Sequence, residues 1–184
     1  MLIDASISFV TPGTPISLVT GAGGSVRSNI IDILGNGVGQ PPSSIIGNTS
    51  VFGSDMGVGK NRVELDTVVG TAFTTSDSAT LNVQLQGAPD TGAGGGYQPG
   101  TWTTIVETGE IPASELTAQS ILGRFPILPY PLSQLPRYLS LNFQVASGTS
   151  FTAGTIAFSV PTMIRDDLAN LLATNNYTVA NLNQ

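Results

Sequence analysis

The stretch LPRYLSLNFQVASGTSFTAGTIAFSV, residues 135–160, decides the fold of this chain. Its first part alternates apolar and polar side chains, which is the period-two pattern of a strand with one buried face. One set is Leu139, Leu141, Phe143 and Val145, and the other is Tyr138, Ser140, Asn142 and Gln144. A turn rich in Ser, Gly and Thr follows, and the alternation resumes at residues 155–160. The stretch therefore predicts two strands joined by a loop.

The same alternation recurs elsewhere, for example in ATLNVQLQ at residues 79–86. The predicted strands cover residues 3–10, 16–20, 29–34, 63–71, 79–86, 101–107, 120–127, 137–146 and 154–160. Many short strands separated by Gly, Pro, Ser and Thr favour an all-β, antiparallel sandwich or barrel. With 184 residues, the chain has the size of one domain.

The chain contains no cysteine and no histidine. Their absence excludes disulfides and thiolate metal sites, and it removes the usual general base and the commonest metal ligand. Serine nucleophiles are plentiful, but no histidine is present to activate them. We therefore expect a protein that is not an enzyme, with no metal and no cofactor.

Charge is scarce and dispersed. Charged residues make up 10% of the chain, against about 25% in an average soluble domain, and the formal net charge is −6. The six basic residues do not cluster, so we expect no direct binding to nucleic acid. The first residues lack a basic region and no apolar run reaches about 20 residues, so we expect neither a signal peptide nor a membrane span.

Two predicted loops are rich in glycine. Residues 35–62 contain seven glycines and exceed the ~12–15 residues of ordinary connections. Residues 87–100 form a shorter loop of similar composition, with Tyr97 near its end. We predict that neighbouring subunits order the first loop, because it carries apolar side chains; surface mobility remains the alternative. These apolar residues are Ile45, Ile46, Val51, Phe52 and Met56.

The last residues change character and predict a helix. Thr162 fits a helix N-cap, and Asp166 and Asp167 suit the positive end of a helix. Apolar residues then recur at helical spacing, at Ile164, Leu168, Leu171 and Leu172. The predicted division is a β domain at 1–161, with an insertion at 35–62, and a short helix and tail at 162–184. The helix either packs on its own sandwich or docks on another subunit.

The motifs that suggest chemistry are incomplete. GSDMGVGKN, residues 53–61, ends like a phosphate-binding loop, but Ser54 replaces the first glycine and Asn61 replaces the final hydroxyl. Glu107 and Glu110 lie close enough in sequence for a glycosidase-like pair, although solvated carboxylates are the favoured interpretation.

Aromatic residues are the candidates for a sugar-binding platform. They are Tyr97, Trp102, Tyr130, Tyr138 and Tyr177. For Trp102 and Tyr138 the strand pattern favours packing in the core or at a sheet edge. Arg137 is predicted to position a sheet edge or to contact a subunit.

Four segments together resemble a known family. They are NIIDIL (29–34), VELDTVVGTAFTTSDSATLNVQLQ (63–86), TWTTIVETGEIPASELTAQS (101–120) and the opening stretch at 135–160. The most specific pieces are MLIDA at the start, IP…LTA at 111–118, and RYLSLNF followed by FTAGTI. In order and spacing, they resemble the jelly-roll cement (decoration) proteins of tailed bacteriophage heads, of the Bordetella phage type. Residues 35–62 and the C-terminal extension depart from the family pattern.

The resemblance implies an antiparallel jelly roll without a catalytic site. It implies a structural viral protein on the capsid exterior of the virion, assembled in the host cytoplasm, that bridges major capsid protein subunits. The expected partners are the phage major capsid protein and the chain itself, as a homodimer or homotrimer, with no nucleic acid and no membrane. The alternative is a carbohydrate-binding jelly-roll module of a virion spike or accessory protein. The candidate subunit or capsid contacts are Ile45, Ile46, Phe52, Tyr97, Arg137, Leu168, Leu172 and Tyr177.

Overall fold

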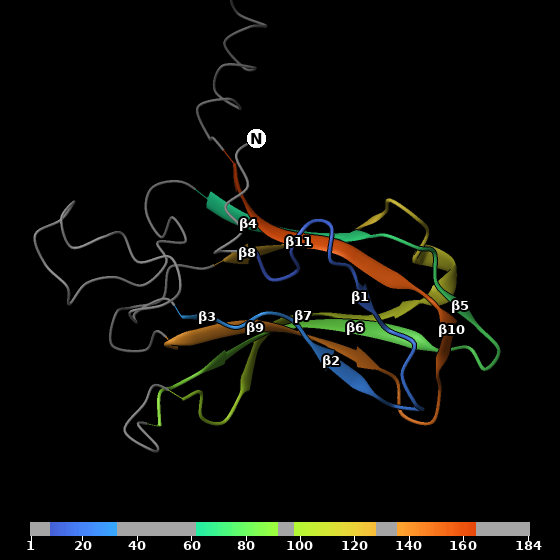
Figure 1. Ribbon diagram of the computed structural model, residues 1–184, viewed down its shortest axis with the longest axis horizontal. Helices are drawn as coiled ribbons and strands as arrows, with labels where there is room; N and C mark the ends of the chain where they lie inside the picture. Colours follow the sequence, from blue (N-terminus) through green and yellow to red (C-terminus); the bar gives the residue numbers. More distant parts are fainter. Residues whose placement is uncertain (1–7, 33–61, 92–97, 128–135, 165–184) are drawn as a thin grey trace, which may run out of the picture.

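Two antiparallel sheets lie face to face in the computed structural model, which describes residues 8–32, 62–91, 98–127 and 136–164 (Figure 1). The first sheet has the order β1 (Ile16–Ser17), β11 (Thr155–Ile164), β4 (Arg62–Val69), β8 (Ile121–Ile127). The second sheet has the order β2 (Ser25–Arg27), β9 (Tyr138–Val145), β6 (Thr80–Ala88), β7 (Thr103–Pro112), and β3 (Ile31–Asp32) also pairs with β9. The predicted all-β, antiparallel fold is confirmed.

Short elements complete the described part of the chain. The strands β5 (Thr74–Thr75) and β10 (Phe151–Ala153) pair with each other as a two-stranded sheet. A single turn of 3-10 helix, η3 (Ala113–Glu115), follows β7. The described ranges contain no α-helix, and therefore no helix that is long and apolar enough to cross a membrane.

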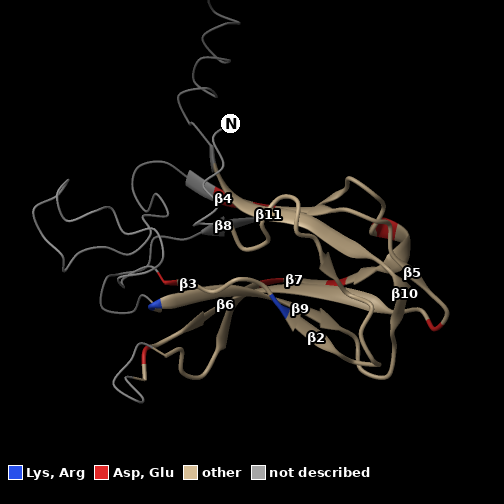
Figure 2. Cartoon of the chain, in the orientation of Figure 1, with Lys and Arg blue, Asp and Glu red and all other residues tan. Residues whose placement is uncertain are grey.

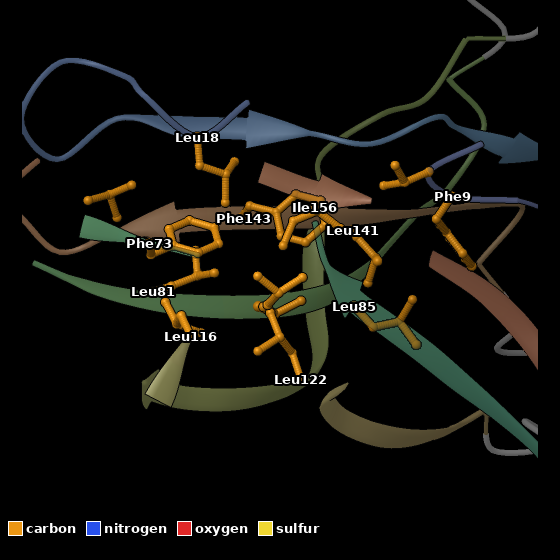
Figure 3. Packing of buried hydrophobic residues seen from close by; sticks show 14 of the residues in the cluster. Phe9, Leu18, Phe73, Leu81, Leu85, Leu116, Leu122, Leu141, Phe143 and Ile156 are labelled. Atoms are coloured by element: carbon orange, nitrogen blue, oxygen red, sulfur yellow. The ribbon is translucent and has the colours of Figure 1, made fainter. Parts of the chain in front are cut away.

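The core forms where the inward faces of the two sheets meet. On β9 and β6, every second residue is apolar and fully buried, as the alternation predicts. Figure 3 shows Leu141 and Phe143 of β9 beside Ile156 of β11 and Leu81 of β6, all within one cluster. One continuous core between two sheets selects the sandwich from the two architectures that the sequence pattern allows.

Several strand boundaries differ from the predicted ones. The predicted strand at 3–10 is described only from Ser8, where Val10 makes an isolated bridge to Ser159. The strand predicted at 101–107 extends to Pro112 as β7. The strand β2 falls in a stretch where the sequence predicts no strand. Glycines at Gly23 and Gly24 precede it, and only the hydrogen bonds to β9 identify it as a strand.

The predicted start of the C-terminal helix is wrong. β11 continues to Ile164, and Thr162, the predicted N-cap, pairs with Glu64 of β4. Pro161 lies within this pairing, opposite Leu65 of β4. β1 pairs with β11 only at Thr155 and Ile156, so at Pro161 β4 is the one described strand paired with β11. Such a one-sided position tolerates a residue without an N–H. The boundary predicted at residues 161–162 therefore falls inside a strand, and the rest of the predicted helix lies outside the described residues.

Gly154 occupies a tightly packed position between β10 and β11. Its φ is +144°, a conformation that residues with a side chain rarely adopt. A Cβ at this position would lie 2.2 Å from Cδ1 of Phe73. Phe73 is 5% exposed, and its ring meets Phe151 edge-on with centroids 4.8 Å apart. Glycine is therefore required here both by the backbone and by the close approach of an aromatic ring.

Candidate binding surfaces

Several strands begin or end at the same end of the sandwich. In the second sheet, the register aligns Asp32 with Tyr138 and Tyr138 with Ala88. In the first sheet, it aligns Arg62 with Ile164. Figure 1 shows these two sheet ends on the same side of the sandwich. We call this side, where β3 and β11 finish and β4 and β9 begin, the Asp32 end.

The Asp32 end adjoins the segments that carry most of the predicted contacts. The described chain stops or resumes there on either side of residues 33–61, 92–97 and 128–135, and it stops before residues 165–184. Seven of the eight candidate contact residues belong to these segments and lie outside the described residues: Ile45, Ile46, Phe52, Tyr97, Leu168, Leu172 and Tyr177. Their role stays a prediction.

Arg137, the eighth candidate, joins three parts of the chain at this end. Its Nε and Nη2 donate hydrogen bonds to the carboxylate of Asp32, at 3.1 and 3.0 Å. Its Nη1 donates to Oδ2 of Asp90 at 2.5 Å. The forked guanidinium matches this two-sided arrangement, which a lysine cannot reproduce. Arg137 thus fixes β3 and the β6–β7 connection to the start of β9.

The environment of Arg137 favours a positioning role over an exposed contact. Its side chain is 14% exposed, and those of Asp32 and Asp90 are 17% and 23% exposed. Hydrogen bonding to Asp32 is the largest of the causes that raise the pKa of Arg137, and the charges of Asp32 and Asp90 add to it. The guanidinium also lies 5.3 Å from the centre of the Tyr138 ring. The cluster is satisfied within the chain.

The base of the β6–β7 connection is closed by backbone hydrogen bonds. The N–H of Thr91 donates to the carbonyl of Gln98 at 3.0 Å, and the N–H of Gly100 donates to that of Pro89 at 2.8 Å. Oδ1 of Asp90 accepts a further hydrogen bond from the N–H of Gln98, at 3.1 Å. Asp90 therefore joins the two ends of this connection through Oδ1, while its Oδ2 accepts a hydrogen bond from Arg137.

A second polar surface covers the outward face of the second sheet. It consists of amide side chains on the two central strands, with a carboxylate, a hydroxyl, a guanidinium and an indole around them. We call it the amide face; its residues are Arg27, Asn82, Gln84, Gln86, Trp102, Thr104, Glu107, Asn142 and Gln144. These positions alternate with the core residues of β6 and β9, so the period-two pattern placed most of them.

Hydrogen bonds link the amide face across three strands. Oε2 of Glu107 on β7 accepts from Asn82 at 2.9 Å and from Gln84 at 3.0 Å. Oε1 of Gln84 in turn accepts from Asn142 on β9 and from Gln86, both at 3.0 Å. Each bond restricts the side-chain rotamers of its partners, so the amides form an ordered array.

Arg27 and Trp102 close the amide face on one side. Nη2 of Arg27 donates to Oε1 of Gln86 at 2.9 Å, and the guanidinium carbon lies 4.2 Å from the centre of the Trp102 ring. This distance suits a cation–π contact. Burial lowers the pKa of Arg27. Trp102 is half-buried just before β7, the edge strand of its sheet, and does not belong to the core cluster, so of the two predicted positions it takes the sheet edge; Tyr138 is buried, at 4% exposure.

The carboxylates of the glycosidase hypothesis lie on the same sheet face. Glu107 pairs with Gln84 and Glu110 pairs with Asn82 in the β6–β7 register. Hydrogen bonds from Asn82 and Gln84, the largest causes, lower the pKa of Glu107 below its ordinary value of 4.5. A general acid at neutral pH requires a raised pKa, so this environment opposes an acid role for Glu107.

Replacing Asn82 with alanine is expected to raise the pKa of Glu107 towards 4.5, because one of its two hydrogen-bond donors is lost. A carboxylate with a lowered pKa in the folded state contributes stability above its ordinary value, and this contribution disappears as the pH falls through the folded-state pKa. An NMR titration of the Glu107 carboxyl carbon measures the change. Gln98→Ala, away from the hydrogen bonds of Glu107, serves as the control; an unchanged pKa in Asn82→Ala would contradict the assignment.

Charge is dispersed over the described sandwich, as Figure 2 shows, and the six basic residues of the chain form no patch in the sequence. Within the described ranges, no three acidic side chains come together as metal ligands. No protein-family model matches the chain, and no curated protein is similar enough to it to count as a relative.

Proposed function

We propose that the chain is a structural, non-enzymatic capsid cement (decoration) protein with a jelly-roll topology. It binds the outer surface of a phage icosahedral head, bridges major capsid protein subunits and acts as a small homo-oligomer, either a dimer or a trimer. It works on the virion exterior after assembly in the host cytoplasm. No nucleic acid, membrane or cofactor takes part.

The strand order supports the jelly-roll part of the proposal. In a jelly roll, two Greek keys distribute eight strands over two sheets. Here the chain passes from β1 to the second sheet at β2 and β3, returns at β4, crosses at β6 and pairs β7 beside it. It then returns at β8, crosses at β9 and finishes at β11, between β1 and β4. Eight positions in two sheets of this order support the proposal of that topology.

The observation that carries the cement role is the convergence of the chain at the Asp32 end. Many functions share one fold, so function must be argued from the surface. The segments with the predicted contact residues all adjoin this end, and the Arg137–Asp32–Asp90 cluster braces the described chain from which two of them leave, residues 33–61 and 92–97. A braced end from which these segments continue fits attachment to a large surface by that end.

The energetics of such attachment are those of a protein interface. A specific interface buries about 1,200–2,000 Å² in total, and repetition over a shell adds many such contacts through multivalency. A surface with few charges is suited to crowding between subunits, because few ions lose their hydration. The chain has 10% charged residues, and Figure 2 shows them spread out.

The proposal predicts that the chain co-sediments with DNA-filled heads of the phage that encodes it. Heads stripped of the chain should release DNA at a lower temperature, and adding the purified chain back should restore the release temperature. Bovine serum albumin at the same concentration is the control for trapping in the pellet. A chain that stays in the supernatant at saturating concentration would refute the cement role.

Deleting residues 168–184 separates the two interpretations of the C-terminal segment. If the segment docks on a neighbour, the truncated chain should lose at least about tenfold in affinity for heads, while its unfolding temperature stays near that of the full chain. Equal losses of attachment and stability would instead place the segment on its own sandwich.

A further inference from the structure

We propose that the amide face is a binding site for a neutral glycan, with Trp102 as the apolar platform and Asn82, Gln84 and Glu107 as the hydroxyl-binding groups. This inference does not require the capsid role, because it uses the outward face of the second sheet, which only Trp102 extends to the Asp32 end. It gives a cement protein a second, outward function: contact with polysaccharide around the particle.

The chemistry of the face matches a polyhydroxylated ligand. A sugar hydroxyl both donates and accepts hydrogen bonds, and an amide side chain offers both a donor and an acceptor. The central strands carry such amides at alternate positions: Asn82, Gln84 and Gln144 are partly exposed. Gln86 and Asn142 are buried, at 9% and 8% exposure, and donate hydrogen bonds to Gln84 from below. The spacing of strands in a sheet, about 4.8 Å, is close to the size of a sugar ring, so neighbouring strands can contact adjacent hydroxyls.

The array is also preorganised. The Glu107 carboxylate fixes Asn82 and Gln84, and Gln84 fixes Asn142, so ordering these side chains on binding costs little additional entropy. One oxygen of Glu107, Oε2, receives both of these bonds, and the side chain is exposed. Its lowered pKa keeps the carboxylate ionised as a strong acceptor for a sugar hydroxyl.

Trp102 supplies the apolar surface that the C–H face of a sugar ring requires. Arg27 lies over one face of the ring at 4.2 Å and is itself bound to Gln86, so the indole is held beside the amides and only its other face can meet a sugar ring. The ring remains half-buried and not enclosed in the core. Amphipathic aromatic side chains with such partial exposure are typical of recognition surfaces.

The charges on the face select a neutral glycan over an acidic one. Arg27 is engaged with Trp102 and Gln86, whereas Glu107 and Glu110 both project from β7 on this side of the sheet. Two carboxylates repel a sialylated or uronic-acid chain. A protein partner is disfavoured for a different reason: the central positions are polar amides, whereas the core of a protein interface is enriched in apolar and aromatic residues.

The test is isothermal titration of the full chain with three neutral probes, cellohexaose, maltohexaose and mannohexaose, and with sialyllactose as the acidic probe. We expect at least one neutral probe to bind and sialyllactose not to bind. Trp102→Ala and Glu107→Gln should each weaken that binding at least about tenfold, because stacking and a charge-assisted hydrogen bond are lost. Gln98→Ala, an exposed amide at the Asp32 end, should bind as the wild type does.

Three outcomes would overturn the glycan proposal. The first is failure of all three neutral probes to bind the wild type at millimolar concentration. The second is binding that survives both Trp102→Ala and Gln84→Ala in chains with wild-type unfolding temperatures. The third is a change of sedimentation coefficient in Trp102→Ala without a change of glycan affinity, which would make the face a contact between copies. Glu107 pairs with Gln84, farther from the Asp32 end, so co-sedimentation of Glu107→Gln with heads should be unchanged, and a failed glycan test leaves the capsid test intact.

Discussion

Replacing Gly154 with alanine is expected to lower the free energy of unfolding by about 3 kcal/mol, because two costs add. The φ of +144° strains any residue with a Cβ, and the new Cβ would lie 2.2 Å from the Phe73 ring. Phe73 has little room to retreat, because Phe151 meets its ring edge-on at 4.8 Å. Chemical denaturation measures the loss as a lower midpoint with an unchanged slope.

Two other glycines are matched controls for Gly154→Ala. Gly148 also has a positive φ, of +80°, but no atom lies within 4 Å of a Cβ built there, so Gly148→Ala should cost about 1 kcal/mol from strain alone. Gly21 has open space and no positive φ, so Gly21→Ala should change stability by less than about 0.5 kcal/mol. Equal losses at Gly154 and Gly148 would show that contact with Phe73 contributes nothing.

Replacing Arg137 with alanine is expected to lower the free energy of unfolding by about 2 kcal/mol. The loss comes mainly from the partners that remain: Asp32 and Asp90 are then left near each other at 17% and 23% exposure without their shared cation. Partial exposure keeps the figure below that of a fully buried pair. Denaturation in low salt gives the value, and high salt should reduce the difference between variant and wild type.

A double-mutant cycle isolates the Arg137–Asp32 pair from the rest of the cluster. Asp32→Asn, Arg137→Ala and the double variant together give the coupling energy, which we expect to be about 1–2 kcal/mol. Arg137→Lys keeps the charge but loses the two-sided hydrogen bonding to Asp32 and Asp90, and it should recover only part of the loss. Additive single effects would show that the pair is not coupled.

The sequence pattern predicts those strands that have one apolar and one polar face. β6 and β9 were predictable because apolar residues alternate with amides and hydroxyls along both strands. The alternation did not predict the burial of polar side chains on the outward face: Ser140 is fully buried and Asn142 is 8% exposed. Their burial depends on segments distant in sequence, such as Ser28, whose hydroxyl lies 3.2 Å from that of Ser140.

The start of the C-terminal helix illustrates the opposite case. Residues after Pro161 have helical spacing of apolar side chains, but residues 160–164 pair with residues 62–66 of β4. The hydrogen bonds of this pairing involve a strand about a hundred positions earlier, which a local window cannot include. Tertiary pairing therefore overrides the local preference.

The Arg137 cluster could not be predicted for the same reason. Its partners Asp32 and Asp90 are 105 and 47 residues away in sequence. Arg27 was missed because it lies in a strand of three residues that follows two glycines. By contrast, Trp102 was recognised as a candidate for sugar binding from its side chain alone, and only the fold places it beside Gln86 and Arg27.

The hydrogen bonds to the Glu107 carboxylate bear on how the protein responds to acid. Mild acidification, as in an endosome, acts on proteins mainly through histidine, and this chain has none. The Glu107 carboxylate organises the amide face, and its pKa lies below the ordinary value for glutamate. A drop from neutrality to about pH 5 therefore does not neutralise it. By the glycan proposal, a ligand bound there should therefore stay bound through such a drop and leave only on dilution or competition.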